Sequence, residues 1–143
     1  MYFDFMPVDN RSRVLLAPQT TGGGAQAYLL PTGGAVAINV RVIAKMGNAA
    51  DLALSLKTAD DAAGTNAAAY PVNTKIYVDG VRQADGVVHT ITDATGNFIV
   101  DFCVDPSLVP AGKFLGISYG ASNASTFLAA EMIEDVAYAP TPT

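Results

Sequence analysis

One pattern typical of a nucleophilic enzyme occurs in the C-terminal third of the chain. The residues Gly116–Gly120, GISYG, match G-x-S-x-G, the turn that presents the nucleophilic serine of α/β-hydrolases. That turn belongs to a parallel sheet with helices, and the catalytic histidine follows the serine in the chain. The one histidine, His89, precedes Ser118, and the surrounding sequence predicts antiparallel strands. We therefore expect the two glycines to mark the ends of a strand and Ser118 to be non-catalytic.

The other residues that could do chemistry lack partners at suitable spacings. His89 lies in VVHTIT, a half-exposed strand pattern with no nucleophile and no second metal ligand nearby. Asp60 and Asp61 are adjacent, whereas a calcium loop places its ligands at alternate positions before a glycine. Cys103 is the only cysteine, which excludes an intramolecular disulfide, and Asp101 on the same strand face predicts a raised thiol pKa. The sequence thus predicts no metal site, no cofactor and no catalytic residue.

A group of three acidic residues near the C-terminus could be taken for the carboxylate pair of a glycosidase. These residues are Glu131, Glu134 and Asp135. Two carboxyl groups flank the scissile bond in such enzymes, which usually add aromatic platforms for the sugar rings. The chain has no tryptophan. We expect these acids to form a polar face or to pair with basic residues of a partner, and we predict that the protein is not an enzyme.

Apolar residues alternate with more polar ones over the stretch 35–57. The alternating apolar residues are Val36, Ile38, Val40, Val42, Leu52, Leu54 and Leu56. A period of two is typical of strands with one face in a core and the other in water. Two such strands close together in the sequence predict an antiparallel sandwich or barrel.

Turn signals divide the rest of the chain into further short strands. Asp79-Gly80 predicts a tight hairpin, and Asp105-Pro106 predicts the capped start of a single helical turn. Counted together, about eight short strands predict an all-β fold, a single antiparallel β-sandwich with at most short helical turns. We assign residues 1–12 to an N-terminal arm, 13–139 to the sandwich domain and 140–143 to a C-terminal tail.

The composition limits the kinds of molecule that we expect the protein to contact. The net charge is −5 and the eight Lys and Arg are scattered, so we expect no direct contact with nucleic acid. No run of about 18 apolar residues occurs, so we expect no membrane span. Asp4 stands where a secretory signal would carry Lys or Arg, which predicts a protein made in the cytoplasm. Half of the residues are hydrophobic and only 15% are charged, which suggests that a partner covers some apolar surface.

Five apolar residues are candidate partner contacts. They are Tyr2, Phe3, Phe5, Ile43 and Ile99. The three aromatic residues lie in the N-terminal arm, and they either pack on their own domain or dock onto a neighbouring subunit. Ile43 and Ile99 occupy outward-facing positions in strands whose other outward residues are mostly polar.

Four stretches of the chain resemble a known family. They are residues 45–52 (KMGNAADL), 56–61 (LKTADD), 93–98 (DATGNF) and 132–135 (MIED). The stretches resemble the capsid cement, or decoration, proteins of tailed bacteriophages, over most of the chain beyond about residue 30. The resemblance implies a jelly-roll domain that forms a homodimer, lies on the outer surface of the virion capsid and bridges major capsid protein subunits. It supplies no catalytic, cofactor-binding or metal-binding residues.

Two other functions fit a small β-sandwich. One is a carbohydrate- or receptor-binding module of a phage tail, for which Tyr70, Tyr77 and Tyr119 are the available aromatic residues, without evident clustering. The other is a head–tail connector component, which forms a ring rather than a lattice of dimers. The lead prediction remains attachment to a capsid that is assembled in the bacterial host cytoplasm.

Overall fold

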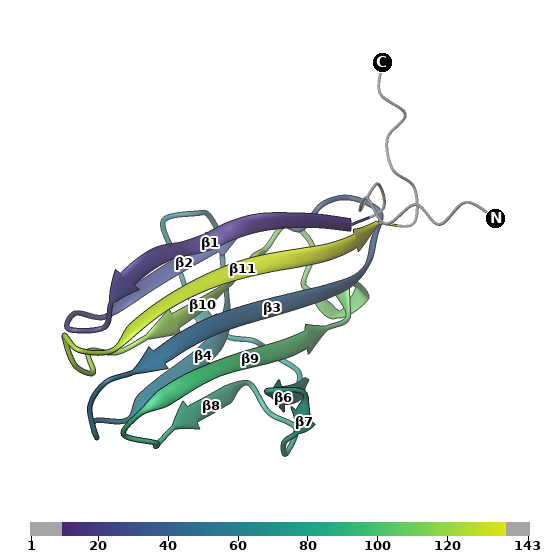
Figure 1. The fold of residues 1–143 in the computed structure, drawn as a ribbon. Helices are drawn as coiled ribbons and strands as arrows, with labels where there is room; N and C mark the ends of the chain where they lie inside the picture. The colour runs from purple at the N-terminus through teal and green to yellow at the C-terminus, as the bar shows by residue number, and fades with distance from the viewer. Residues whose placement is uncertain (1–9, 137–143) are drawn as a thin grey trace.

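Two antiparallel sheets pack face to face in this computed structural model, which describes residues 10–136 (Figure 1). One sheet has six strands in the order β1-β11-β3-β9-β6-β7, and the other has the order β2-β10-β4-β5, with β8 also paired to β4. The elements are β1 (Asn10–Thr20), β2 (Ala25–Leu29), β3 (Ala35–Met46), β4 (Leu52–Ala59), β5 (Ala68–Ala69), β6 (Lys75–Val78), β7 (Val81–Arg82), β8 (Val88–Ile91), β9 (Gly96–Val104), η1 (Pro106–Leu108), β10 (Phe114–Tyr119) and β11 (Phe127–Val136). The prediction of an all-β antiparallel sandwich is confirmed.

The core lies between the two sheets and is built largely from the alternating stretch. Its buried residues from β3 and β4 are Ile38, Val40, Val42, Ala44, Met46, Leu52, Leu54 and Leu56. Burying one Val, Leu or Ile side chain contributes about 1.5–3 kcal/mol, so these rows supply much of the stability. β3 and β4 belong to different sheets and face each other across the core. Val36 departs from the predicted pattern because it is exposed at the start of β3.

The two strongest local turn signals are confirmed. Asp79 and Gly80 have φ values of 49° and 79°, as a two-residue type I′ hairpin requires, and they join β6 to β7. The Asp105 side chain accepts a hydrogen bond from the backbone N–H of Ser107, and Pro106 opens the short helix η1. Both turns are therefore determined by residues that are neighbours in the sequence.

β1 is longer than its sequence predicts. The sequence indicates a short strand near residues 13–16, whereas β1 begins at Asn10, inside the range 1–12 assigned to an arm, and pairs with β11 along its length. The register shifts between Val14 and Leu16 and again between Leu16 and Gln19. Bulges of this kind interrupt the alternation of side chains, so Leu15 and Leu16 are both buried. An alternating pattern was therefore not visible in this strand.

A fully buried carboxylate lies on the inner side of β11, where the sequence predicted a polar or partner-facing residue. Glu134 receives hydrogen bonds from Arg13 Nε at 2.9 Å and Nη2 at 2.6 Å, both to Oε1. The backbone N–H of Thr32 donates to Oε2 at 2.6 Å, and its hydroxyl donates to Oε1 at 3.0 Å. Arg13 Nη2 also donates to the carbonyl of Leu30 at 2.8 Å. The expectation for Glu134 was wrong because β1 brings an arginine to the inner side of the sheet.

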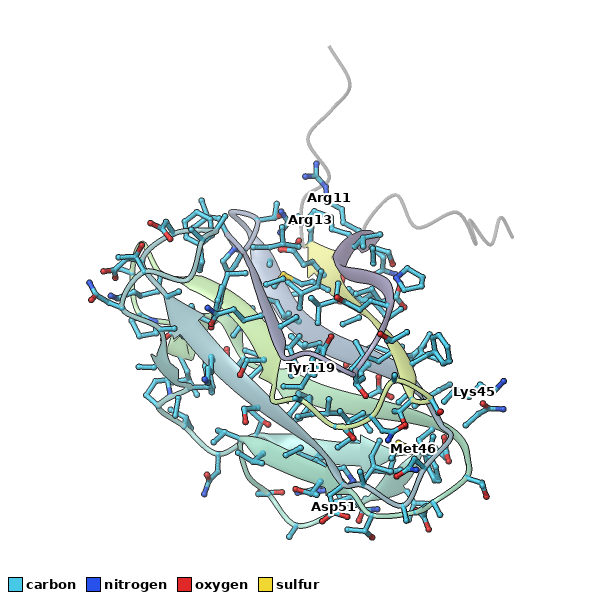
Figure 2. The ribbon with its side chains drawn as sticks, turned by 90° about the vertical axis from the view of Figure 1, so that its left-hand side faces the viewer. Arg11, Arg13, Lys45, Met46, Asp51 and Tyr119 are labelled. Atoms are coloured by element: carbon cyan, nitrogen blue, oxygen red, sulfur yellow. The ribbon has the colours of Figure 1, made fainter. Side chains whose placement is uncertain are left out.

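This network ties together three parts of the chain. Glu134 is in β11, Arg13 is in the edge strand β1, and Thr32 is in the turn between β2 and β3. A buried carboxylate is strongly unfavourable unless an opposite charge and hydrogen-bond donors compensate its lost hydration. Figure 2 shows Arg13 against the body of the molecule, whereas Arg11 projects from its end.

Replacing Arg13 by alanine should lower the free energy of unfolding by about 3–5 kcal/mol, because it leaves the Glu134 carboxylate buried without its counter-charge. Arg11→Ala is the matched control, since Arg11 is exposed two residues away on the same strand, and it should change stability by less than about 0.5 kcal/mol. Urea unfolding of both variants measures the difference. Equal losses in the two variants would contradict a stabilising role for the ion pair.

Candidate interaction surface

The serine of the G-x-S-x-G pattern and the single histidine lie on opposite faces of the five-stranded sheet. Ser118 is directly opposite Ser55 of β4, and both are half-buried on the outer face. His89 of β8 is opposite Leu54, which is buried in the core. Directly opposed residues share a face of a sheet, so His89 points toward the interior side. The structure therefore does not bring Ser118 and His89 together.

The two glycines of this pattern have different surroundings. A Cβ at Gly116 would lie 1.9 Å from the carbonyl oxygen of Ala27 and 2.5 Å from Cδ1 of Tyr28, both in β2. A Cβ at Gly120 would meet nothing within 4 Å. Gly116 thus allows β2 to approach β10 closely, whereas Gly120 lies in open space after the strand.

Gly116→Ala should lower the free energy of unfolding by about 2 kcal/mol or more, because the added methyl group forces β2 away from β10. Gly120→Ala is the matched control from the same five residues and should stay within about 0.5 kcal/mol of the parent. Thermal or urea unfolding compares the two. A Gly116→Ala protein as stable as Gly120→Ala would show that the close approach is not needed.

The acidic pair in the loop after β4 is engaged by side chains of the loop and by Lys113, which precedes β10. Asp60 forms an ion pair with Lys113 and accepts a hydrogen bond from Asn66 at 2.7 Å, and these contacts lower the pKa of its carboxyl group. Asp61 accepts hydrogen bonds from the Thr65 hydroxyl at 2.7 Å and the Thr65 N–H at 3.0 Å. Among residues 10–136, no group of three or more His, Cys, Asp or Glu is arranged to hold a metal ion. Both aspartates therefore act as loop-stabilising residues.

The tyrosines that a sugar-binding site would use are not gathered on one surface. Tyr70 and Tyr119 are buried in the core, and Figure 2 shows Tyr119 inside the sandwich. Tyr77 is half-buried on β6 with the guanidinium of Arg82 5.7 Å from its ring centroid. These positions do not form an aromatic platform.

A row of charged side chains crosses the outer face of the six-stranded sheet. Register places Glu131 of β11 opposite Arg41 of β3, and Arg41 opposite Asp101 of β9. Arg41 Nε lies 2.7 Å from Asp101 Oδ1, and this hydrogen bond raises the pKa of Arg41, with Glu131 adding to the effect. Asn39 Nδ2 donates to the same Asp101 oxygen at 2.9 Å. The middle of this face is therefore polar and ordered by hydrogen bonds.

Cys103 lies on the same outer face, two residues from Asp101. Burial of the thiol raises its pKa most, and the Asp101 carboxylate raises it further. The predicted direction is confirmed. The larger cause, desolvation, depends on neighbouring strands and was not visible in the sequence.

An apolar patch lies beside the charged row, and we call it the outer patch. Its residues are Val14, Pro18, Ile43, Ile99, Phe127 and Ala129. Ile43 is directly opposite both Ile99 and Ala129, so the structure brings together the two isoleucines chosen from the sequence. Val14 is 69% exposed, Ile43 47% and Phe127 46%, and Pro18 is exposed as well. A shallow groove of about 210 Å³ runs between Val14, Pro18, Ile43 and Ala129.

Four of the six residues of the outer patch were missed by sequence reasoning. Phe127 and Ala129 were within reach, because the apolar residues Leu128, Ala130 and Met132 alternate along the strand and their neighbours have to face the other way. Val14 and Pro18 gave no such signal, since the bulges of β1 obscure its alternation. The predicted contacts Tyr2, Phe3 and Phe5 lie outside the described residues.

In the part of the chain that the structure describes, no helix has the length and hydrophobicity needed to cross a membrane. Comparisons with protein-family models, with curated proteins and with solved structures find no match. A function for this chain has to be inferred from its surfaces and from the sequence resemblance.

Proposed function

We propose that the chain is a non-enzymatic virion structural protein, a cement or decoration protein that binds the outside of a tailed-phage capsid. In this role it bridges major capsid protein subunits and stabilises them. The observation that carries the proposal is the outer patch, a contiguous apolar area on the outer face of the six-stranded sheet. Contiguous apolar surface of this kind typically marks a protein–protein contact in soluble proteins.

The surroundings of the outer patch suit an attachment surface. The charged row of Glu131, Arg41 and Asp101 lies directly beside it, so an apolar centre has a polar border, as in many protein interfaces. The patch spans β1, β11, β3 and β9, which are long paired strands. A contact surface on such a sheet is rigid before binding, which lowers the entropic cost of association.

Stabilisation of a capsid follows from mass action. A protein that binds only the assembled lattice stabilises it by about 2.7 kcal/mol per site when its free concentration is 100 times Kd. The outer patch also suits a two-fold contact with a second copy, in which the same patch serves both partners. The jelly-roll topology, the homodimer, the capsid partner and the location on the virion surface come from the sequence resemblance.

Ile43→Asp should reduce the number of copies bound per purified head at least about tenfold, since a charge desolvated in the contact costs more than 1.4 kcal/mol. Val88→Asp is the matched control, because Val88 is 51% exposed on the outer face of the opposite sheet. Heads of the encoding phage are incubated with each variant, pelleted and analysed for bound protein.

The parent and Val88→Asp should decorate the heads equally. Both variants should unfold at the same urea concentration as the parent, since both sites are exposed. Full occupancy by Ile43→Asp would remove the outer patch from the attachment surface. Absence of binding by the parent would refute the proposed function itself.

A further inference from the structure

A second groove lies at the other end of the same sheet face. At this end β1 begins and β11 ends (Figure 1). Its volume is about 680 Å³, within the range of sites that hold small ligands or short peptide segments. Its apolar lining comes from several elements: Val36, Tyr70, Val72, Val104, Leu108 and Ile133. Val36, Val72 and Leu108 are exposed although they line one hollow. The groove is thus an apolar surface that lacks a cover among residues 10–136.

One polar atom beside the groove lacks a hydrogen-bond partner. Asn39 Oδ1 is buried and accepts no hydrogen bond from the described residues, while Nδ2 of the same side chain donates to Asp101. Buried acceptors in native proteins are nearly always paired. A peptide segment in the groove would bring backbone N–H donors to this part of the sheet.

We propose that the groove is the docking site of the chain's own N-terminal segment, residues 2–5. Asn10, the first described residue, and Asp135 of β11 both line the groove, so the chain enters β1 at its rim. In an extended segment, Phe3 and Phe5 point to the same side and Asp4 to the other. The segment therefore presents two rings to an apolar hollow and a carboxylate to water.

The length of the segment fits the width of the groove. Crossing from β1 over β11, β3 and β9 to β6 takes four strand spacings, about 19 Å in total. An extended chain places Phe5 up to about 17 Å and Tyr2 up to about 26 Å from Asn10. The rings thus reach the lining between β3 and η1. A dry cavity of about 150 Å³ accommodates one benzene ring, so the groove has room for the aromatic rings of this segment.

In this arrangement the aromatic rings of the segment pack on their own domain. Of the two alternatives that the sequence leaves open, the proposal thus favours this one over docking onto a neighbouring subunit. This inference does not depend on capsid binding.

Cys103 provides the test, because it lines the groove and is the only cysteine of the chain. A segment that crosses from Asn10 to β6 covers the thiol. The rate of reaction with a water-soluble aromatic disulfide is measured on the isolated full chain. The double variant Phe3→Ser/Phe5→Ser should raise the rate constant of this reaction about fivefold or more. In the parent the segment covers the thiol most of the time, and in the variant it leaves the thiol exposed most of the time. Val88→Ser, at an exposed residue on the outer face of the five-stranded sheet, is the control and should leave the rate unchanged.

A variant of the groove itself completes the test. Leu108→Asp alone should raise the rate constant of the thiol reaction to the level of the Phe3→Ser/Phe5→Ser variant. Combined with those two substitutions it should cause no further increase, because both changes remove the same contact between the segment and the groove. Equal rates in the parent and the arm variant would overturn the proposal. Protection that disappears on dilution would also overturn it, since a second copy would then supply the segment. Neither outcome bears on attachment through the outer patch.

Discussion

The six-stranded sheet depends on how the buried carboxylate of Glu134 is compensated. This carboxylate has no exposed surface, so it is tolerable only with Arg13 and Thr32 as donors. These contacts hold the edge strand β1 against β11 and fix the turn that leads into β3. β1 also carries Val14 and Pro18. The buried ion pair therefore adds to the backbone pairing that holds β1, and with it Val14 and Pro18, beside the rest of the outer patch.

The six-stranded sheet uses its two faces for different purposes. Its inner face supplies the core, together with the leucines of β4. Its outer face is divided along the strands into three zones. The charged row of Glu131, Arg41 and Asp101 lies in the middle, the outer patch lies toward the start of β11, and the larger groove lies toward its end. The division places two apolar surfaces on one rigid support, with an ordered polar zone between them.

Local chemistry was readable from the sequence, and long-range pairing was not. The alternation in β3 predicted a strand, and Asp79-Gly80 predicted a hairpin. Both signals depend only on residues that are neighbours in the sequence. Ile43 and Ile99 were chosen separately, and only the register of β3 with β9 shows that they are in contact. Glu134 was misjudged because its charge favoured an exposed position, and its partner Arg13 lies 121 residues away in sequence. The bulges of β1 hid Val14 and Pro18.

The central claim is that the chain attaches through the outer face of its six-stranded sheet. Electron cryomicroscopy of decorated heads tests it most directly, since the two sheets differ in strand number and are distinguishable in a map. The predicted map shows copies outside the capsid shell with the outer patch buried, either against major capsid protein or against a second copy. A map in which the outer patch faces solvent while the five-stranded sheet makes the contact would contradict the claim.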